Sequence, residues 1–308
     1  MKVNEAVHLI ECPLENIFTG VYAILGEGIA LIDAGLPDSP ETAIFPYLRG
    51  IGRDPSDISL VVITHGHDDH FGGAAAIVKA SGARIAAHPA DAAYVENPAK
   101  LWLDLHERFP RYHPKPEVER SAGADVDLPL EDGMRLDLGP FEAEIVHTPG
   151  HTDGSICIYD RKGRSLFTGD SVQGRGTVVQ SGPLVYGSME DYVSSMMRLK
   201  ALDPRTMLLD HQYLPLDGAV ITGADVAKAL DVSVKCVEEI SDAILRSIES
   251  KNSADMDQMV GEVKAIYGVT PTSMAPCSIV DAALRSLQRR GLISRSSSGR
   301  WEPVRRPP

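Results

Sequence analysis

The amino-acid sequence predicts a layered α+β fold followed by a smaller, mostly helical region. Over about the first two hundred residues, short apolar runs with strand character alternate with helical stretches, which is typical of folds that pack helices on sheets. From about Gly223 onward the strand-like runs nearly vanish. Because the length of 308 residues exceeds one average domain, we expect two domains, residues 1–222 and residues 223–308.

The first region begins with a hairpin signal, since the apolar runs 21–25 and 29–33 flank Gly26-Glu-Gly28. The remaining elements follow from periodicity and from turn residues. Strands are expected over residues 58–64, 83–88, 135–138, 141–146, 155–159, 165–168 and 206–209, and helices over residues 43–48, 71–80 and 188–202.

Segment 97–126 interrupts this alternation. It contains Trp102, Phe109 and Tyr112 together with several prolines, and we expect an insertion that borders the active-site face. Either its aromatic side chains line a pocket or they hold a long loop in place.

Three amphipathic helices and a hairpin are expected in the second region, an order that is typical of a winged helix. Winged helices often bind nucleic acid, but a fold alone does not establish a function. We expect this one to cover the active site or to make a homodimer contact. The helices are expected over residues 225–249, 256–267 and 278–290, and the hairpin strands over residues 292–295 and 300–304.

The net charge of −13 lies almost entirely in the first region. Residues 1–222 hold 18 Lys and Arg against 32 Asp and Glu, whereas residues 223–308 hold 12 against 11. A strongly acidic region repels phosphate backbones, so the composition disfavours a nucleic-acid substrate. The stretch 281–308 is locally basic, with seven Arg against Asp281 and Glu302.

The composition also indicates a cytoplasmic protein. No window approaches about 18 uninterrupted apolar residues, and the start of the chain is too polar for a signal peptide. The four cysteines have no paired spacing and are expected as reduced, packed thiols; they are Cys12, Cys157, Cys236 and Cys277.

The strongest chemical signal is the heptapeptide Thr-His-Gly-His-Asp-Asp-His at residues 64–70, which follows an apolar run that begins at Ile58. Three imidazoles and two carboxylates at the end of one strand offer the nitrogen and oxygen donors that zinc prefers. The alternative, a polar loop with surface histidines, does not explain why further ligand-type residues follow strand-like runs. These are His151 after the Pro149-Gly150 turn, Asp170 after a glycine, and His211.

In order along about residues 1–215, four segments resemble the signatures of the metallo-β-lactamase superfamily. They are Leu31–Gly35, Thr64–His70, His147–His151 and Thr168–Asp170. The resemblance implies a four-layered αββα sandwich with a dinuclear metal site at one edge of the paired sheets.

The same resemblance implies a ligand set. The presence of Asp69 favours the branch of hydrolases that bind two ions. The ions are expected to be zinc, with iron or manganese as alternatives. His65, His67 and His151 would hold one ion, Asp69, His70 and His211 the other, and Asp170 would bridge them.

One position departs from the family pattern. The last ligand usually lies in a Pro-Gly-His-Gly-like turn, whereas His211 follows Leu209-Asp210 and is assigned by elimination and position. Its main rival, His147, is expected to orient a ligand instead. Asp33 and Asp68 are expected as orienting or structural carboxylates. Surface or core roles are expected for His8, His88, His106 and His113.

The expected activity is hydrolysis of an ester, thioester or lactone of a small molecule. Two ions about 3.5–4 Å apart can share a water and generate a bridging hydroxide, so Asp170 would act in catalysis as the bridge and Asp69 could pass a proton to the leaving group. Tyr186 and Tyr192 are candidates to donate a hydrogen bond to substrate, although Tyr192 could equally pack on a helix face. A quinolone-signal-type thioesterase is the branch that the layout after Asp170 resembles most.

Two other functions are weighed against this one. The first is a metal-dependent endoribonuclease or nuclease in which the winged-helix-like tail grips nucleic acid; the acidic first region counts against it. The second is a non-enzymatic ligand sensor, which the complete ligand set disfavours. In the nuclease, the phosphate contacts would come from Arg289, Arg290, Arg295 and Arg300.

Overall fold

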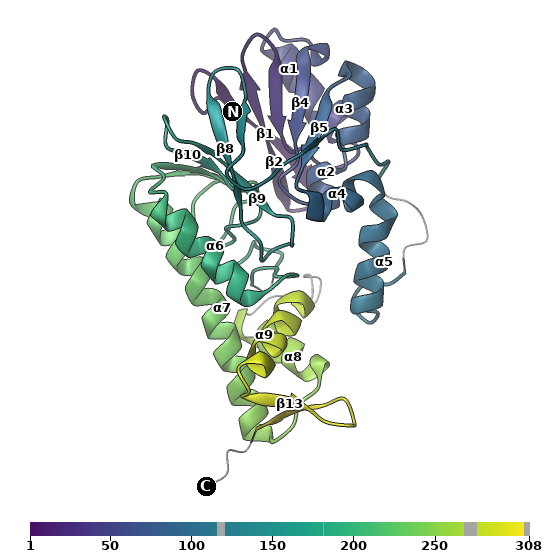
Figure 1. The fold of residues 1–308 in the computed structure, drawn as a ribbon, viewed down its shortest axis with the longest axis vertical. Helices are drawn as coiled ribbons and strands as arrows, with labels where there is room; N and C mark the ends of the chain where they lie inside the picture. Colours follow the sequence, from purple (N-terminus) through teal and green to yellow (C-terminus); the bar gives the residue numbers. More distant parts are fainter. Residues whose placement is uncertain (116–120, 181, 268–275, 305–308) are drawn as a thin grey trace.

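Two six-stranded sheets pack face to face in the upper part of the computed structural model as drawn in Figure 1. The structure describes residues 1–115, 121–180, 182–267 and 276–304. In the first sheet the strands follow the chain order. The pairs from β1 to β3 are antiparallel and those from β3 to β6 are parallel. The strands are β1 (Val7–Leu14), β2 (Ile17–Leu25), β3 (Ile29–Ile32), β4 (Ile58–Val62), β5 (Arg84–Ala87) and β6 (Leu128–Pro129).

The second sheet has the order β12-β11-β10-β9-β8-β7, and all its pairs are antiparallel except β10 with β11. Its central strand β9 is buried at every residue. The strands are β7 (Arg135–Asp137), β8 (Glu142–His147), β9 (Ile156–Asp160), β10 (Ser165–Phe167), β11 (Thr206–Leu208) and β12 (Val220–Thr222).

Helices cover the outer face of each sheet, which gives the expected four layers (Figure 1). On the first sheet these are a helical turn at Pro40–Ile44, α1 (Phe45–Gly50), a turn at Pro55–Asp57, α2 (Asp68–Phe71) and α3 (Ala74–Ser81). Two further helices, α4 (Pro89–Glu96) and α5 (Pro98–Arg108), follow β5. The second sheet is covered by α6 (Met189–Ala201) and α7 (Ala224–Lys251).

The C-terminal region has the expected helices and hairpin, and Figure 1 shows it extending away from the two sheets. The long helix α7 packs against α6 at its start and against α8 and α9 further along. The hairpin is attached to the helices by paired backbone bonds between Ala254 and Trp301. The elements are α8 (Met256–Tyr267), α9 (Cys277–Arg289), β13 (Ile293–Arg295) and β14 (Trp301–Pro303).

Three expectations need correction. Strands β1, β6 and β12 were not predicted, and the helix expected over residues 71–80 is split into α2 and α3. The split occurs at Gly72-Gly73 because the loop after β3 passes very close there: a Cβ at Gly73 would lie 2.3 Å from the Ala34 carbonyl oxygen. Of the two alternatives for segment 97–126, the long loop is wrong, since α5 occupies its first third, whereas Trp102 does line a pocket. Residues 116–120 of this expectation lie outside the described part of the chain.

Candidate metal centre

A loop held by two buried carboxylates carries the first histidines of the site. Directly after β4, the backbone N–H and the hydroxyl of Thr64 both donate to Asp33, each over 2.7 Å. The N–H of Gly66 donates to Asp91 over 2.8 Å, and the same carboxylate accepts from Thr152 and from Gly154. Asp33 and Asp91 therefore fix the loop against β3 and against the loop that follows β8.

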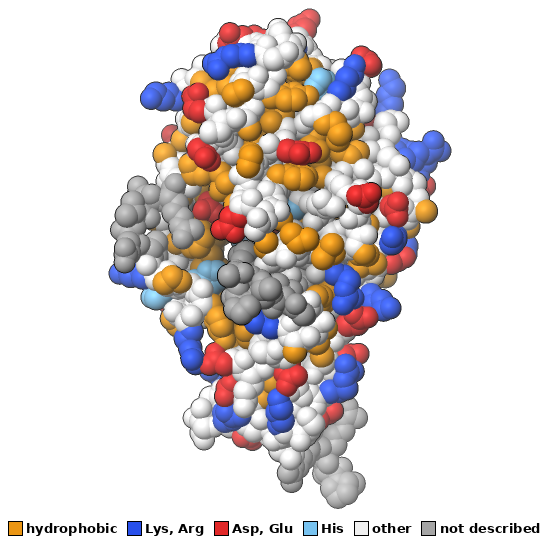
Figure 2. Space-filling model, turned by 180° about the vertical axis from the view of Figure 1, so that it is seen from behind, with side chains coloured by type: hydrophobic (Ala, Val, Ile, Leu, Met, Phe, Trp, Pro, Cys, Tyr) orange, Lys and Arg blue, Asp and Glu red, His pale blue; other side chains and the backbone are white. Residues whose placement is uncertain are grey.

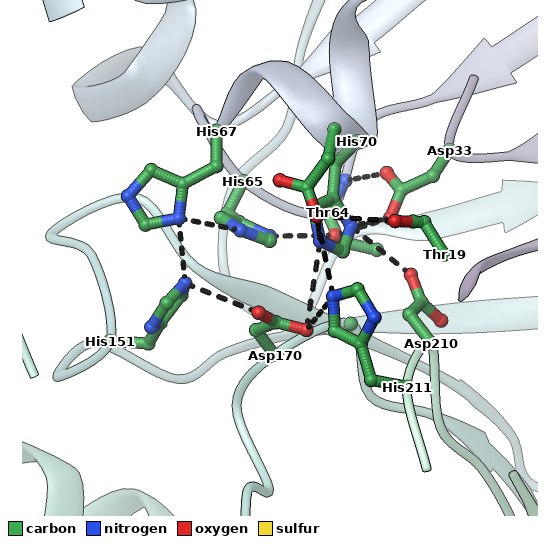
Figure 3. Close-up of polar contacts among 12 residues, drawn as sticks. Thr19, Asp33, Thr64, His65, His67, His70, His151, Asp170, Asp210 and His211 are labelled. Carbon is green, nitrogen blue, oxygen red and sulfur yellow. Dashed lines mark hydrogen bonds and ion pairs between the residues drawn. The ribbon is translucent and has the colours of Figure 1, made fainter. Parts of the chain in front are cut away.

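Three imidazoles meet in the first half of the site (Figure 3). His67 Nδ1 lies 3.1 Å from His65 Nε2 and 2.9 Å from His151 Nε2. His151 reaches this place through the predicted turn, in which Gly150 has a φ of +138°, and a Cβ there would lie 2.5 Å from the Cα of Tyr192. The ring nitrogens of these three histidines thus face one common point.

The second half of the site combines a carboxylate with two imidazoles. His67 is the residue before α2, and Asp69 and His70 lie on its single turn. Asp69 Oδ2 lies 3.5 Å from His70 Nε2 and 3.3 Å from His211 Nε2. The structure therefore brings His211 to the position that was assigned to it only by elimination.

Asp170 lies between the two halves. Its Oδ2 is 3.6 Å from His151 Nε2, whereas its Oδ1 is 3.6 Å from both His70 Nε2 and His211 Nε2 (Figure 3). The preceding Gly169 has a φ of +48°, and a Cβ there would clash with the Thr64 side chain at 2.5 Å. The glycine thus permits the close approach of β10 to the histidine loop.

Hydrogen bonds orient the rings from the outside. In four of the five rings, the nitrogen that points away from the centre has a partner: His65 Nδ1 contacts the Thr64 hydroxyl at 3.0 Å, and His70 Nδ1 contacts Asp33 at 2.8 Å. Backbone carbonyls do the same for His151 (Leu184, 2.8 Å) and His211 (Phe18, 2.6 Å). Such partners set the tautomer and leave the other nitrogen free to bind a metal.

The protonation equilibria suit metal binding. Burial lowers the pKa of His65, His67 and His151, that of His67 to about 3, so these rings are neutral at pH 7. Burial raises the pKa of the Asp69 carboxyl, but the charges of His70 and His211 outweigh it and the net shift is downward. For His70 the directions are reversed: burial by itself lowers the pKa of the ring, but the surrounding carboxylates outweigh burial and the net shift is upward. This half of the site therefore stabilises positive charge.

Two of the buried polar atoms without a hydrogen-bond partner lie at the centre of the cluster, where a bound cation would contact them. Among the described residues, His70 Nε2 and Asp170 Oδ1 are buried without a hydrogen-bond partner, although buried polar atoms are normally satisfied. Both face the centre of the cluster. Neutral imidazoles and ionised carboxylates are the donors that divalent transition metals bind, so the residues present fit a divalent-metal site.

A pocket of about 340 Å³ opens onto this centre. Its polar end is formed by His67, Asp69, Asp170 and His211. The remaining wall is largely apolar. It consists of Leu14, Glu15, Ile17, Leu36, Asp68, Leu101, Trp102, Leu105, His113, Val179, Gln180, Leu184 and Tyr186.

Comparison with known proteins agrees with this geometry. The family model described as the metallo-beta-lactamase superfamily matches residues 16–211, which span every residue of the cluster. The chain belongs to the metallo-β-lactamase superfamily.

Similar proteins of known name include hydroxyacylglutathione hydrolases and acyl-coenzyme A thioesterases. The chain is 30% identical over 212 residues to the hydroxyacylglutathione hydrolase of Erythrobacter litoralis, an alignment that covers 67% of this chain and 70% of the relative. It is 29% identical over 193 residues to the enzyme of the same name from Cereibacter sphaeroides, with 62% of each chain covered. It is 33% identical over 195 residues to the acyl-coenzyme A thioesterase MBLAC2 of Gallus gallus, with 58% of this chain and 65% of the relative covered.

Solved structures share the fold over nearly the whole chain. A metallo-beta-lactamase family protein from Thermus thermophilus has a TM-score of 0.79 at 20% identity, covering 98% of this chain and 100% of that one. A beta-lactamase domain protein from Burkholderia ambifaria has a TM-score of 0.76 at 16% identity, covering 99% and 93%. The metallo-β-lactamase fold in these proteins therefore includes a counterpart of the C-terminal helices.

The two candidate substrate tyrosines have different positions. Tyr186 lines the pocket, with its ring 5.0 Å from that of His67. Tyr192 is 1% exposed on the buried face of α6 and is not part of the described pocket wall. Its expected role in substrate binding is therefore not supported, because the close contact between Gly150 and the Tyr192 backbone directs this part of α6 into the core.

Several other histidines differ from the expectations. His147 does not orient a ligand: its Nε2 contacts the Asp153 carbonyl at 2.9 Å, and its ring stacks on His88 at 4.1 Å. His113, for which the sequence offered no signal, lines the pocket, and the His106 ring contacts its carbonyl.

Some functional residues carry no sequence signal. Thr19 donates to Asp69 over 3.1 Å, Gln173 contacts His151 at 3.1 Å, and Asp210 lies 3.3 Å from His70. They come from separate segments, and each residue type is common in unrelated contexts. Only for Asp210, as the neighbour of His211, could position have indicated a role.

Proposed function

We propose that this protein is a metal-dependent hydrolase that cleaves thioesters of small molecules. The observation that carries the proposal is the position of Asp170, whose two oxygens face the two halves of the cluster. The names of the relatives, hydroxyacylglutathione hydrolase and acyl-coenzyme A thioesterase, support the thioester as the bond that is cleaved.

The cluster would hold two divalent ions, with zinc as the expected metal. The three-histidine half offers His65 Nε2, His67 Nδ1 and His151 Nε2, and the other half offers Asp69, His70 and His211. Asp170 would contact both ions. When bound, such ions supply Lewis-acid stabilisation of a substrate oxygen and activate a water as the nucleophile.

The residues around the centre would prepare the reaction. Attack of water on the thioester carbonyl forms the C–O bond and breaks the C–S bond, and the departing thiolate takes a proton. Asp69 is the carboxylate on the pocket wall that could carry this proton, and the Thr19 hydroxyl holds its Oδ2. Tyr186 is suited to donate a hydrogen bond to substrate, because burial raises the pKa of its hydroxyl and keeps it protonated.

The nuclease alternative gains no support from three of the four C-terminal arginines that it requires. Arg289 pairs with Glu190, and Arg300 pairs with Asp255, so both charges are already neutralised. Arg295 lies over the Trp301 ring. On the face drawn in Figure 2, the Lys and Arg of the lower, C-terminal part are interspersed with Asp and Glu. Among the described residues on this face, the charges do not form the continuous basic groove that suits a phosphate backbone.

Hydrolysis of N-acetylcysteamine thioesters tests the proposal, with the released thiol measured by Ellman's reagent. We expect turnover that is lost after treatment with a chelator and restored by zinc or manganese. His67→Ala should abolish turnover. His8→Ala should not, because His8 lies on β1 and its ring contacts the Tyr47 hydroxyl. Cleavage of structured RNA by metal-loaded protein that leaves thioesters, esters and lactones intact would overturn the proposal.

A further inference from the structure

Helix α5 forms part of the pocket wall beside the metal centre. Leu101 and Leu105 are one helical turn apart, and both line the pocket together with Trp102. Leu103, on the other side of the same helix, is 45% exposed. The segment that interrupts the predicted alternation therefore presents a three-residue apolar surface to whatever binds beside the metals.

Two further segments of the pocket wall, at the turn between β1 and β2 and in the loop before α6, contribute mostly apolar side chains. Leu14 and Ile17 flank the turn between β1 and β2, and Val179, Leu184 and Tyr186 come from the loop before α6. Outside the metal end, the polar groups on this wall are the side chains of Glu15, Asp68, His113 and Gln180, the Trp102 indole and the Tyr186 hydroxyl, so apolar side chains form most of it. A pocket of about 340 Å³ lies near the lower end of the roughly 300–1,000 Å³ that is usual for small-molecule sites.

The charged side chains on the described pocket wall disfavour an anionic group away from the metal end. Among the described lining residues there is no Lys or Arg, and the charged side chains outside the cluster are the acids Glu15 and Asp68. Burial lowers the pKa of His113, so its ring is neutral at pH 7. Arg108, which lines the adjoining hollow, is bound by Asp281 at 2.6 Å.

Together these observations define the group that fits. We infer that the pocket binds the acyl part of the substrate, and that this acyl group is apolar and uncharged. The inference rests on the proposed thioesterase function. Glutathione and coenzyme A, the thiols in the names of the relatives, are polar and charged, so the apolar, acid-lined wall suits the acyl group instead of the thiol.

A chain-length series on one uncharged thiol tests the inference directly. We would measure kcat/KM for acetyl, butyryl, hexanoyl and octanoyl N-acetylcysteamine, together with the succinyl thioester as the charged analogue of butyryl. We expect kcat/KM to rise up to about threefold to fourfold for each added methylene that is buried. The succinyl thioester should be slower than the butyryl thioester by roughly tenfold or more.

Substitutions show whether the dependence of kcat/KM on acyl chain length comes from the residues that line the pocket. Trp102→Ala should lower kcat/KM for octanoyl by roughly tenfold while acetyl changes little, because contact area is lost only for the long chain. Leu103→Ala, on the exposed side of α5, should leave both unchanged. Glu15→Lys should raise the succinyl-to-butyryl ratio several-fold, whereas Glu27→Lys, at the exposed turn between β2 and β3, should not.

Binding without turnover gives an independent readout. The S-octyl thioether of N-acetylcysteamine should bind more tightly than the S-ethyl thioether in calorimetry, and Trp102→Ala should remove the difference. A flat chain-length profile, or a preference for succinyl over butyryl, would overturn the inference while leaving the thioesterase function intact. If no thioester is hydrolysed at all, the proposed function itself fails.

Discussion

Thr19 shows how a residue outside the cluster can control a ligand. Its hydroxyl, fully buried on β2, donates to Asp69 Oδ2 over 3.1 Å. The hydrogen bond holds the carboxylate toward His70 and His211, and removing it would free Asp69 to rotate. Partners of this kind are worth typically about 10–100-fold in metal affinity or activity.

Thr19→Val, which keeps the shape of the side chain, should therefore weaken binding of metal by roughly tenfold or more. Competition with a chromophoric chelator measures the change. Thr42→Val is the matched control, because the Thr42 hydroxyl is exposed and bonds only the Asp38 carbonyl. Equal affinities for Thr19→Val and the wild-type protein would show that Asp69 does not need this partner.

At the residue scale, the sequence pointed to the side chains that the structure brings together, but not to the residues around them. The seven candidate ligands could be found because histidines and aspartates are concentrated at strand ends, and the structure brings all seven together. Thr19, Asp91 and Gln173 could not be found, because their roles depend on which segments meet in space. Tyr192 was misjudged for the same reason, since its burial depends on the approach of Gly150.

At the scale of elements, a network of charged side chains joins α5 to α9 beside the pocket. Asp281 on α9 accepts from Arg108 on α5 at 2.6 Å and from Arg285 at 2.9 Å. Both arginines also donate to the backbone carbonyl of Tyr186, at 2.7 and 3.3 Å. The N–H of Tyr186 in turn donates to the carbonyl of His151 over 2.9 Å. The C-terminal helices thus brace the pocket wall next to the metal centre.

Asp281→Asn should weaken the contacts of Asp281 with Arg108 and Arg285. We expect KM for a thioester to rise roughly threefold with little change in kcat, because the pocket wall is displaced while the metal centre is retained. Stability should fall by no more than about 1 kcal/mol, since the ion pairs are partly exposed. Asp281→Glu should restore part of the loss, and Asp242→Asn, an exposed acid on α7, should behave as wild type. A fall in kcat alone would contradict this positioning role.

Elements with a clear period were predicted well, and those without one were not. The three C-terminal helices follow from regular apolar spacing and were placed to within a few residues. Strand β1 was not predicted because its first four residues are all buried, which removes the alternation of a half-exposed strand. The break between α2 and α3 is a tertiary effect of the loop after β3, which local sequence does not encode.

At the scale of the whole molecule, the two sheets and the C-terminal helices bury all four cysteines. Burial raises the pKa of each thiol to about 11. Thiolates are the reactive form, so the native protein should react with Ellman's reagent at no cysteine at pH 8. In denaturant all four should react. A fast-reacting thiol in the native state would show that one part of this packing opens readily.

The layered architecture could be predicted from the order of elements and from the family resemblance. For the C-terminal region, the sequence favoured covering the active site or making a homodimer contact over binding nucleic acid, but it could not identify the residues that make the contact. The structure shows that Arg285 and Arg289 are engaged with the catalytic region. None of the described helices has the length and apolar character that crossing a membrane requires.

Metal stoichiometry shows whether Asp170 joins two metal sites. Wild-type protein is loaded with zinc, freed of unbound ions and measured by elemental analysis. We predict two ions per chain for the wild type and for Asp137→Asn, an exposed control on β7. For Asp170→Asn, which removes the charge that both halves share, we predict fewer than two. One ion or none in the wild type, or two retained by Asp170→Asn, would show that Asp170 does not join two metal sites.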